Sequence, residues 1–264
     1  MTFANKTVWI IGASSGIGRA VALDMAIHGA KLVLSSRNLT ELQKVKDECL
    51  QSTEHCIVIP LDLEKNSDYS NETNKIIIEY GKIDYLILVG GVSQRSLISE
   101  TPLSIDRKLM EINYFGIISI TKSVLPYMIK QKSGHITVIS SIVGKFGFPL
   151  RSAYSASKHA LHGYFETLRA EQHSNNINVT VVIPGRVSTN ISQNALLKDG
   201  SKYNHFDKGQ EQGISVQSCS KQILKAIKKN NKEVLIGGKE LTMVWLRRFL
   251  PFLFYKFATK IQPK

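Results

Sequence analysis

The stretch Gly12-Ala13-Ser14-Ser15-Gly16-Ile17-Gly18 decides the fold of this 264-residue chain. It stands between an apolar run of strand length at residues 8–11 and a helical pattern at residues 17–28. Glycines let a ligand approach the backbone closely, and the free N–H groups of a helix start attract phosphate. The spacing is not that of the commoner G-x-G-x-x-G loop, and no Lys-Ser/Thr pair follows as in a Walker A loop. We expect a pyrophosphate-binding turn; a plain glycine-rich turn is the alternative.

Outward from this turn, apolar runs of strand length alternate with segments of helix length. The expected strands are residues 8–11, 31–35, 56–60, 85–89, 135–140, 179–183 and 233–236, and the expected helices are residues 17–28, 39–50, 67–80, 103–130, 153–173 and 216–229. The strands are apolar on both faces, which is typical of a parallel sheet covered by helices. We predict one α/β domain at residues 1–238, a doubly wound (Rossmann-type) seven-stranded parallel sheet flanked by helices, with a helical C-terminal tail at residues 239–264.

The net charge of +13 invites three interpretations: nucleic acid, an anionic membrane surface or an anionic ligand. Residues 239–264 hold six basic residues and one acidic residue, so +5 of the charge lies in the tail. The chain carries no recognised nucleic-acid motif, and its aromatic residues lie in core-like or tail runs rather than on a basic stacking face. We therefore predict no nucleic-acid partner.

The tail is aromatic as well as basic between residues 242 and 258. Arg247, Arg248 and Pro251 interrupt this segment, so it cannot be a helix that spans a membrane. Two interpretations carry equal weight. The tail is a helix pair at the surface of an anionic membrane, or it packs on the substrate pocket or on a partner subunit.

The cysteine and histidine residues predict neither a disulfide framework nor a metal site. Cys49, Cys56 and Cys219 are odd in number and form no C-x-x-C pair. His159 and His162 lie three residues apart and lack further ligands nearby in the sequence, so we expect no bound metal. The N-terminus leaves no room for a signal peptide before the first strand. We expect a cytoplasmic protein, with peripheral membrane contact through the tail as one of the two interpretations above.

The end of the second strand bears on the choice of dinucleotide. Sites that prefer NAD tend to place a carboxylate here to bind the ribose 2′-hydroxyl. This chain has Ser36 and Arg37 instead, with Arg19 just after the glycine turn. Arginine matches a 2′-phosphate with paired, charge-assisted hydrogen bonds. We therefore favour NADP(H); the alternative is that Arg37 is a solvated loop charge.

Tyr154 and Lys158 open the helix expected at residues 153–173. Positions i and i+4 share a helix face, so the phenol and the ammonium can act on the same space. A nearby ammonium favours the phenolate and would lower the tyrosine pKa, which suits a general acid and base. A surface pair is the alternative, but the helix follows a strand that ends in Ser140-Ser141.

The glycine turn, the Tyr154/Lys158 pair, Ser141, Asn113 in Asn-Tyr-Phe-Gly, and Pro184-Gly185-x3-Thr189 together resemble the short-chain dehydrogenase/reductase family over roughly residues 5–237. The resemblance implies four catalytic residues. Tyr154 would exchange a proton with the substrate oxygen, Ser141 would bond that oxygen, Lys158 would hold the nicotinamide ribose and lower the Tyr154 pKa, and Asn113 would hold a relay water. Thr189 would bond the carboxamide. The implied cofactor-binding residues are Gly12, Ser14, Ser15, Gly16, Ile17, Gly18, Ser36, Arg37, Asp62, Leu63, Gly90, Tyr154, Lys158, Pro184, Gly185, Val187 and Thr189.

These residues predict an NADP(H)-dependent oxidoreductase that transfers a hydride between nicotinamide and a carbonyl or secondary alcohol. We expect an apolar substrate, in a pocket lined by Gln94, Phe146, Phe148, Leu150, Arg186 and the loop at residues 186–213. The resemblance also implies a homodimer or homotetramer. The alternative is a catalytically silent NADP(H)-binding or scaffold protein, because fold does not fix function.

Two departures from the family pattern stand out. Ile11 replaces the usual Thr, and Leu88-Val89-Gly90-Gly91 replaces the usual Asn-Asn-Ala-Gly. We expect them to alter packing rather than to abolish function.

Overall fold

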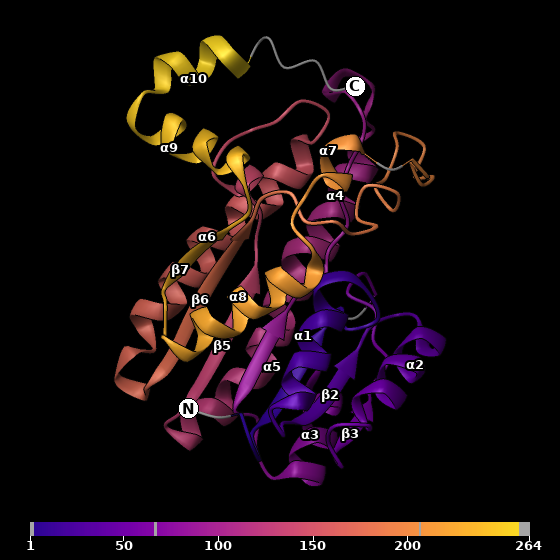
Figure 1. Cartoon of the computed structure of the whole chain (residues 1–264), viewed down its shortest axis with the longest axis vertical. Coiled ribbons are helices and arrows are strands. Elements are labelled where there is room, and N and C mark those ends of the chain that lie inside the picture. Colours follow the sequence, from indigo (N-terminus) through magenta and orange to yellow (C-terminus); the bar gives the residue numbers. More distant parts are fainter. Residues whose placement is uncertain (1–2, 66–67, 206, 259–264) are drawn as a thin grey trace.

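A seven-stranded sheet forms the centre of the molecule (Figure 1), in a computed structural model that describes residues 3–65, 68–205 and 207–258. The strand order is β3-β2-β1-β4-β5-β6-β7 and every neighbouring pair is parallel. The strands are β1 (Thr7–Ile11), β2 (Lys31–Ser35), β3 (Cys56–Val58), β4 (Tyr85–Leu88), β5 (Gly134–Ile139), β6 (Ile177–Pro184) and β7 (Glu233–Ile236). The prediction of a doubly wound parallel sheet is confirmed.

Helices cover both faces of this sheet. The chain forms α1 (Gly16–Ile27), α2 (Leu39–Cys49), α3 (Ser70–Tyr80), α4 (Leu103–Met110), α5 (Gly116–Gln131), α6 (Ser152–Glu171), α7 (Lys208–Glu211) and α8 (Val216–Lys228). Apolar side chains of α1, α2 and α8 share one core with the sheet, and those of α3, α5 and α6 share another. Short 3-10 turns lie at Ile98–Glu100, Ile142–Gly144, His173–Asn175 and Lys239–Leu241.

The point where the strand order reverses lies between β1 and β4. The register pairs Ile11 of β1 with Ser35 of β2 and with Leu88 of β4, so these strands end at one edge of the sheet. Open α/β sheets bind ligands outside the carboxyl ends of the strands at such a switch point. The glycine turn and the segment after β4 meet there.

The helix predicted at residues 103–130 is interrupted, so the prediction of one continuous helix is wrong. A π-helical turn, η2 (Glu111–Phe115), separates α4 from α5. The buried Asn113 side chain explains the interruption. Its amide group accepts a hydrogen bond from the Val92 backbone N–H at 2.8 Å and donates to the Val92 carbonyl at 2.9 Å. Turns of this kind are frequent at functional sites.

The C-terminal tail folds into a helix pair, α9 (Thr242–Phe249) and α10 (Pro251–Ala258). Figure 1 shows both helices in yellow, at the end of the molecule toward which the strands point. Leu250 separates them, and Pro251 begins the second helix. Within the described ranges, no helix is both long enough and apolar enough to cross a bilayer. The basic residues Lys260 and Lys264 lie outside those ranges.

Candidate active site

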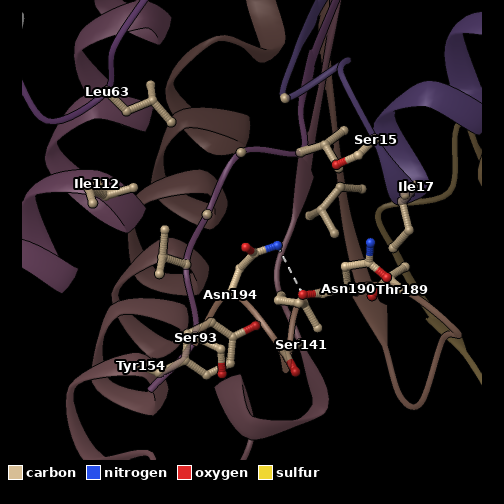
Figure 2. Close-up of a pocket in the computed structure, with 18 of the residues that line it drawn as sticks. Ser15, Ile17, Leu63, Ser93, Ile112, Ser141, Tyr154, Thr189, Asn190 and Asn194 are labelled. Carbon is tan, nitrogen blue, oxygen red and sulfur yellow. Dashed lines mark hydrogen bonds between the residues drawn. The ribbon is translucent and has the colours of Figure 1, made fainter. Parts of the chain in front are cut away.

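A pocket of about 550 Å³ opens at the carboxyl edge of the sheet. Its walls come from the glycine turn, the ends of β2, β4, β5 and β6, the start of α6 and the loop that follows β6. Every predicted catalytic or cofactor-binding residue lines this pocket except Gly18 and Asn113. Figure 2 shows Ser15, Leu63, Ser141, Tyr154 and Thr189, from five separate segments, around the same space.

The glycine turn adopts a conformation that glycine alone accepts without strain. Gly12 has φ +85° and Gly16 has φ +53°. A Cβ atom on Gly12 would lie 2.8 Å from the backbone nitrogen of Gly90, so the turn packs directly on the segment after β4. A Cβ atom on Gly16 would lie 3.3 Å from Cγ2 of Thr189, which places the two cofactor segments side by side.

The start of α1 is suited to a pyrophosphate. Ser15 is the N-cap residue, its side chain makes no capping hydrogen bond, and the first turn carries no acidic residue. The first N–H groups of a helix have no partner within the helix, and the helix dipole favours negative charge there. These residues therefore fit the diphosphate of a dinucleotide.

Gly18 does not line the pocket but packs directly against the glycine turn. A Cβ atom there would lie 2.1 Å from the Gly12 carbonyl oxygen. Gly18→Ala must displace the turn, so we expect a loss of about 2 kcal/mol in the free energy of unfolding and at least tenfold weaker NADPH binding. Thermal unfolding and a cofactor titration would measure both effects.

Gly163→Ala is the matched control for this substitution. Gly163 is an exposed glycine within α6, and a Cβ atom there would meet nothing within 4 Å. Alanine should stabilise the helix by up to about 1 kcal/mol and leave cofactor binding unchanged. Equal behaviour of the two variants would contradict the role given to Gly18.

The two arginines near the predicted 2′-phosphate site differ in availability. Arg37 is exposed and lines the pocket beside Ser36, and within the described parts of the chain no hydrogen bond or ion pair occupies its guanidinium. Arg19, by contrast, bonds to Glu48 of α2 and does not line the pocket. The guanidinium of Arg19 is thus engaged by Glu48 in this structure, and a share of Arg19 in cofactor binding stays a prediction.

Tyr154 and Lys158 project from the first turns of α6 and are both buried. The ammonium of Lys158 donates to the Ile139 carbonyl at 2.9 Å and lies 5.8 Å from the centre of the Tyr154 ring. Ser141 follows the end of β5 and lies in the same part of the pocket as Tyr154 (Figure 2). The predicted constellation of phenol, ammonium and serine hydroxyl is thus brought together.

The electrostatics of Tyr154 differ from the expectation. Burial raises the pKa of its phenol above the ordinary value, while Arg151, a hydrogen bond with Ser141 and Arg95 act to lower it. Burial lowers the pKa of Lys158 to about 8. Arg151 and Arg95 thus add positive charge that favours the phenolate, and the predicted lowering of the Tyr154 pKa by Lys158 stays a prediction.

Asn113 reaches the site indirectly. Besides its two bonds to Val92, its amide nitrogen donates to Oγ of Ser157 at 3.2 Å. It fixes the segment after β4 against α6, and it does not line the pocket. Its role in a water relay stays a prediction.

A cluster of charged residues in the pocket region was not predicted. Arg95 and Arg151 line the pocket, and both pair with Asp207 of the long loop. The loop also places Asn190 and Asn194 in the wall, joined by a hydrogen bond of 3.1 Å from Asn194 Nδ2 to the Asn190 carbonyl (Figure 2). The loop therefore lines the pocket, and its role in bordering the substrate stays a prediction.

Several side chains expected in the substrate pocket lie elsewhere. Gln94 is buried, and its Oε1 accepts from the Ala153 backbone N–H at 2.9 Å, so it fixes the start of α6. Phe146 packs against Phe254 of the tail instead of the cavity. Phe148, Leu150 and Arg186 are also absent from the lining. The apolar residues that do line the cavity include Val92, Ile112 and Leu196.

The site geometry agrees with a comparison of sequences. A family model described as short chain dehydrogenase matches residues 6–199. The chain belongs to the short-chain dehydrogenase/reductase family. It is 42% identical over 257 residues to dehydrogenase/reductase SDR family member 7B of Mus musculus, covering 96% of this chain and 80% of the relative. It is 38% identical to dehydrogenase/reductase SDR family protein 7-like of Anopheles gambiae, covering 95% of this chain and 81% of that protein.

Solved structures of short-chain dehydrogenases share the fold. One from Burkholderia phymatum in complex with NAD superposes with a TM-score of 0.85 at 21% identity, covering 100% of this chain and 98% of the other. An alcohol dehydrogenase from Thermococcus sibiricus complexed with 5-hydroxy-NADP gives a TM-score of 0.76 at 22% identity, covering 89% and 97%. The family is thus an oxidoreductase family with a nicotinamide-binding fold, in which both NAD and NADP complexes occur.

Proposed function

We propose that this chain is an NADP(H)-dependent oxidoreductase that interconverts a carbonyl group and a secondary alcohol. The observation that carries the proposal is the convergence of Ser141, Tyr154 and Lys158 in one pocket with the glycine turn. An apolar substrate is proposed because Val92, Ile112 and Leu196 line the cavity.

In the reduction, Tyr154 gives its phenolic proton to the carbonyl oxygen, and in the oxidation it takes the proton back. Ser141 donates a hydrogen bond to the same oxygen and holds it beside the phenol. Lys158 holds the ribose next to Tyr154. When bound, the nicotinamide cofactor supplies or accepts the hydride. Reduction needs the protonated phenol, so its rate should fall as the pH rises through the Tyr154 pKa, which burial raises.

The preference for NADP(H) is proposed on two features. Ser36 and Arg37 line the pocket at the end of β2, where a carboxylate would select NAD. The Arg37 guanidinium is exposed and unengaged by other described residues, so it can form the paired bonds that a 2′-phosphate accepts.

Turnover distinguishes this proposal from the silent alternative. The purified full chain should oxidise NADPH in the presence of a panel of apolar ketones and aldehydes. NADPH binding without oxidation across the whole panel would favour a silent nucleotide-binding protein.

We further propose that residues 1–238 form the catalytic domain, residues 239–264 an appended tail, and the assembly a homodimer or homotetramer. The assembly rests on family membership, and sedimentation velocity would test it. A cytoplasmic location is proposed because Cys49, Cys56 and Cys219 are free and buried.

The outer face of the tail supports peripheral contact with an anionic membrane. Its exposed large side chains include Trp245, Phe249 and Tyr255, and no acidic residue lies between 242 and 258. The Trp245 and Phe249 rings stack with centroids 5.9 Å apart. Aromatic rings at the headgroup level with cations between them are typical of interfacial helices.

Vesicle sedimentation tests the membrane contact. The full chain should bind vesicles that contain phosphatidylserine, and Trp245→Ala with Phe249→Ala should weaken the partition at least tenfold, since each ring buries apolar area worth more than about 1 kcal/mol. Ile78→Ala, an exposed apolar residue on α3 outside the tail, is the control and should change nothing. Equal partition of all three proteins would leave the tail without a membrane role.

A further inference from the structure

The tail is fixed to the catalytic domain by one deeply buried ring. Phe254 is 4% exposed and is the one buried residue within the described tail helices. Its neighbours on α10 point outward: Phe252 is 67% exposed, and Tyr255 and Phe257 are exposed as well. A single ring that is buried while the neighbouring rings are exposed to solvent indicates a specific docking contact.

Phe254 packs on the segment that joins the two catalytic side chains. Its ring lies 5.3 Å from that of Phe146 between centroids, and it shares one buried cluster with Phe146, Val143 and the catalytic Tyr154. Val143 and Phe146 both lie between Ser141 and Tyr154 in the sequence. Met243, Val244, Leu246 and Ala258 of the tail pack around the same cluster.

The same segment also approaches α6 closely. A Cβ atom on Gly144 would lie 2.6 Å from Ser140 Oγ and 3.0 Å from the Lys158 carbonyl oxygen. Gly144 therefore packs closely against α6, while Val143 and Phe146 of the same segment pack with Phe254. Because packed interiors transmit displacements, loss of the covering ring would be felt at Tyr154.

The start of the tail is also bonded to the catalytic domain. Oε1 of Glu240 accepts from the Arg186 backbone N–H at 2.7 Å and from the Gly238 N–H at 3.0 Å. A Cβ atom on Gly185 would lie 2.2 Å from the same oxygen. Glu240 therefore locks the tail onto the segment after β6, which lines the cofactor end of the pocket.

From these contacts we infer that Phe254 is a positioning residue for Tyr154, so that the tail is a working part of the active site. The inference rests on the proposed function of Tyr154 as proton donor. Phe254 holds the phenol at the distance that proton transfer requires and keeps water from its inner side. A misplacement of about 1 Å in such a site can cost about a hundredfold in rate.

Phe254→Ala in the full chain tests this inference against Phe252→Ala, an exposed ring two residues away. We expect Phe254→Ala to lower kcat about 10- to 100-fold, with the Kd for NADPH within about twofold of wild type. Phe254→Leu, which refills most of the volume, should recover most of the loss. Phe252→Ala should match wild type in both measurements.

The pH profile separates positioning from simple loss of folding. Burial raises the Tyr154 pKa, and removal of the Phe254 ring would admit water, so the pKa should fall. The loss of reductase activity at high pH should then begin at a lower pH in Phe254→Ala than in wild type. A variant that is merely less stable would keep the wild-type profile, and that result would overturn the inference.

Hydrogen exchange makes the outcome independent of turnover. Faster exchange of residues 142–154 in Phe254→Ala than in Phe252→Ala supports the packing role even if wild type proves silent, in which case the proposed function fails instead. Unchanged exchange together with unchanged kcat would reject the positioning role and leave the proposed function intact.

Discussion

Tyr154→Phe is expected to lower kcat about 1000-fold and to leave NADPH binding unchanged. The substitution removes one oxygen, and the loss corresponds to that of a general acid. The ring remains in its cluster with Val143, Phe146 and Phe254, so the fold should hold. Steady-state oxidation of NADPH with the best ketone of the panel gives kcat, and quenching of protein fluorescence gives the Kd of the cofactor.

Tyr164→Phe is the matched control, because Tyr164 lies on the same helix and is half-buried against Tyr114. Its kcat should equal that of wild type. If Tyr154→Phe kept more than a tenth of the wild-type kcat, another group would have to supply the proton.

The second large effect concerns the choice of cofactor. Ser36→Asp with Arg37→Ala should raise the Kd for NADPH about 100-fold. The variant loses charge-assisted bonds to the 2′-phosphate, worth about 1.5–3 kcal/mol, and places a carboxylate beside that phosphate. The Kd for NADH should fall or stay level, because the new carboxylate can accept the ribose hydroxyl. Titration with both cofactors measures the ratio.

Lys122→Asp is a control with the same change of net charge. Lys122 is an exposed residue of α5 and does not line the pocket. It should leave both Kd values within about twofold, since exposed charges beyond a Debye length are screened. If the double variant kept its preference for NADPH, the assignment of Ser36 and Arg37 would be wrong.

Local patterns in the sequence predicted most of the fold. Each strand is a short apolar run bounded by polar residues or glycine, and such a run is readable without knowledge of its neighbours. The break at Glu111–Phe115 could not be predicted from the sequence. Its cause is a pair of hydrogen bonds between Asn113 and Val92, which lies 21 residues away. No local propensity signals such a turn.

The same distinction between local patterns and distant contacts applies to the candidate site. The glycine turn and the Tyr154/Lys158 pair have fixed spacing within one element, and both were found. The pairing of Arg19 with Glu48 and of Arg95 with Asp207 joins residues 29 and 112 positions apart, so the sequence offered no signal for either. The sequence left two alternatives of equal weight for the tail. Phe254 contacts Phe146 of the catalytic domain, and contact of the tail with a membrane stays a prediction.

A one-residue phase shift separates α4 from α5. A regular α-helix advances by about 100° per residue, and the π-helical turn between these helices holds one residue more than a regular turn. Upstream, Ile105 and Leu109 face a small cluster beside the pocket; downstream, Ile117 and Ile120 face the sheet. Deletion of any one residue of the turn would rotate one helix by about 100° relative to the other and detach Asn113 from the segment after β4. The number of residues in this turn, more than the identity of most of them, therefore sets the orientation of Asn113.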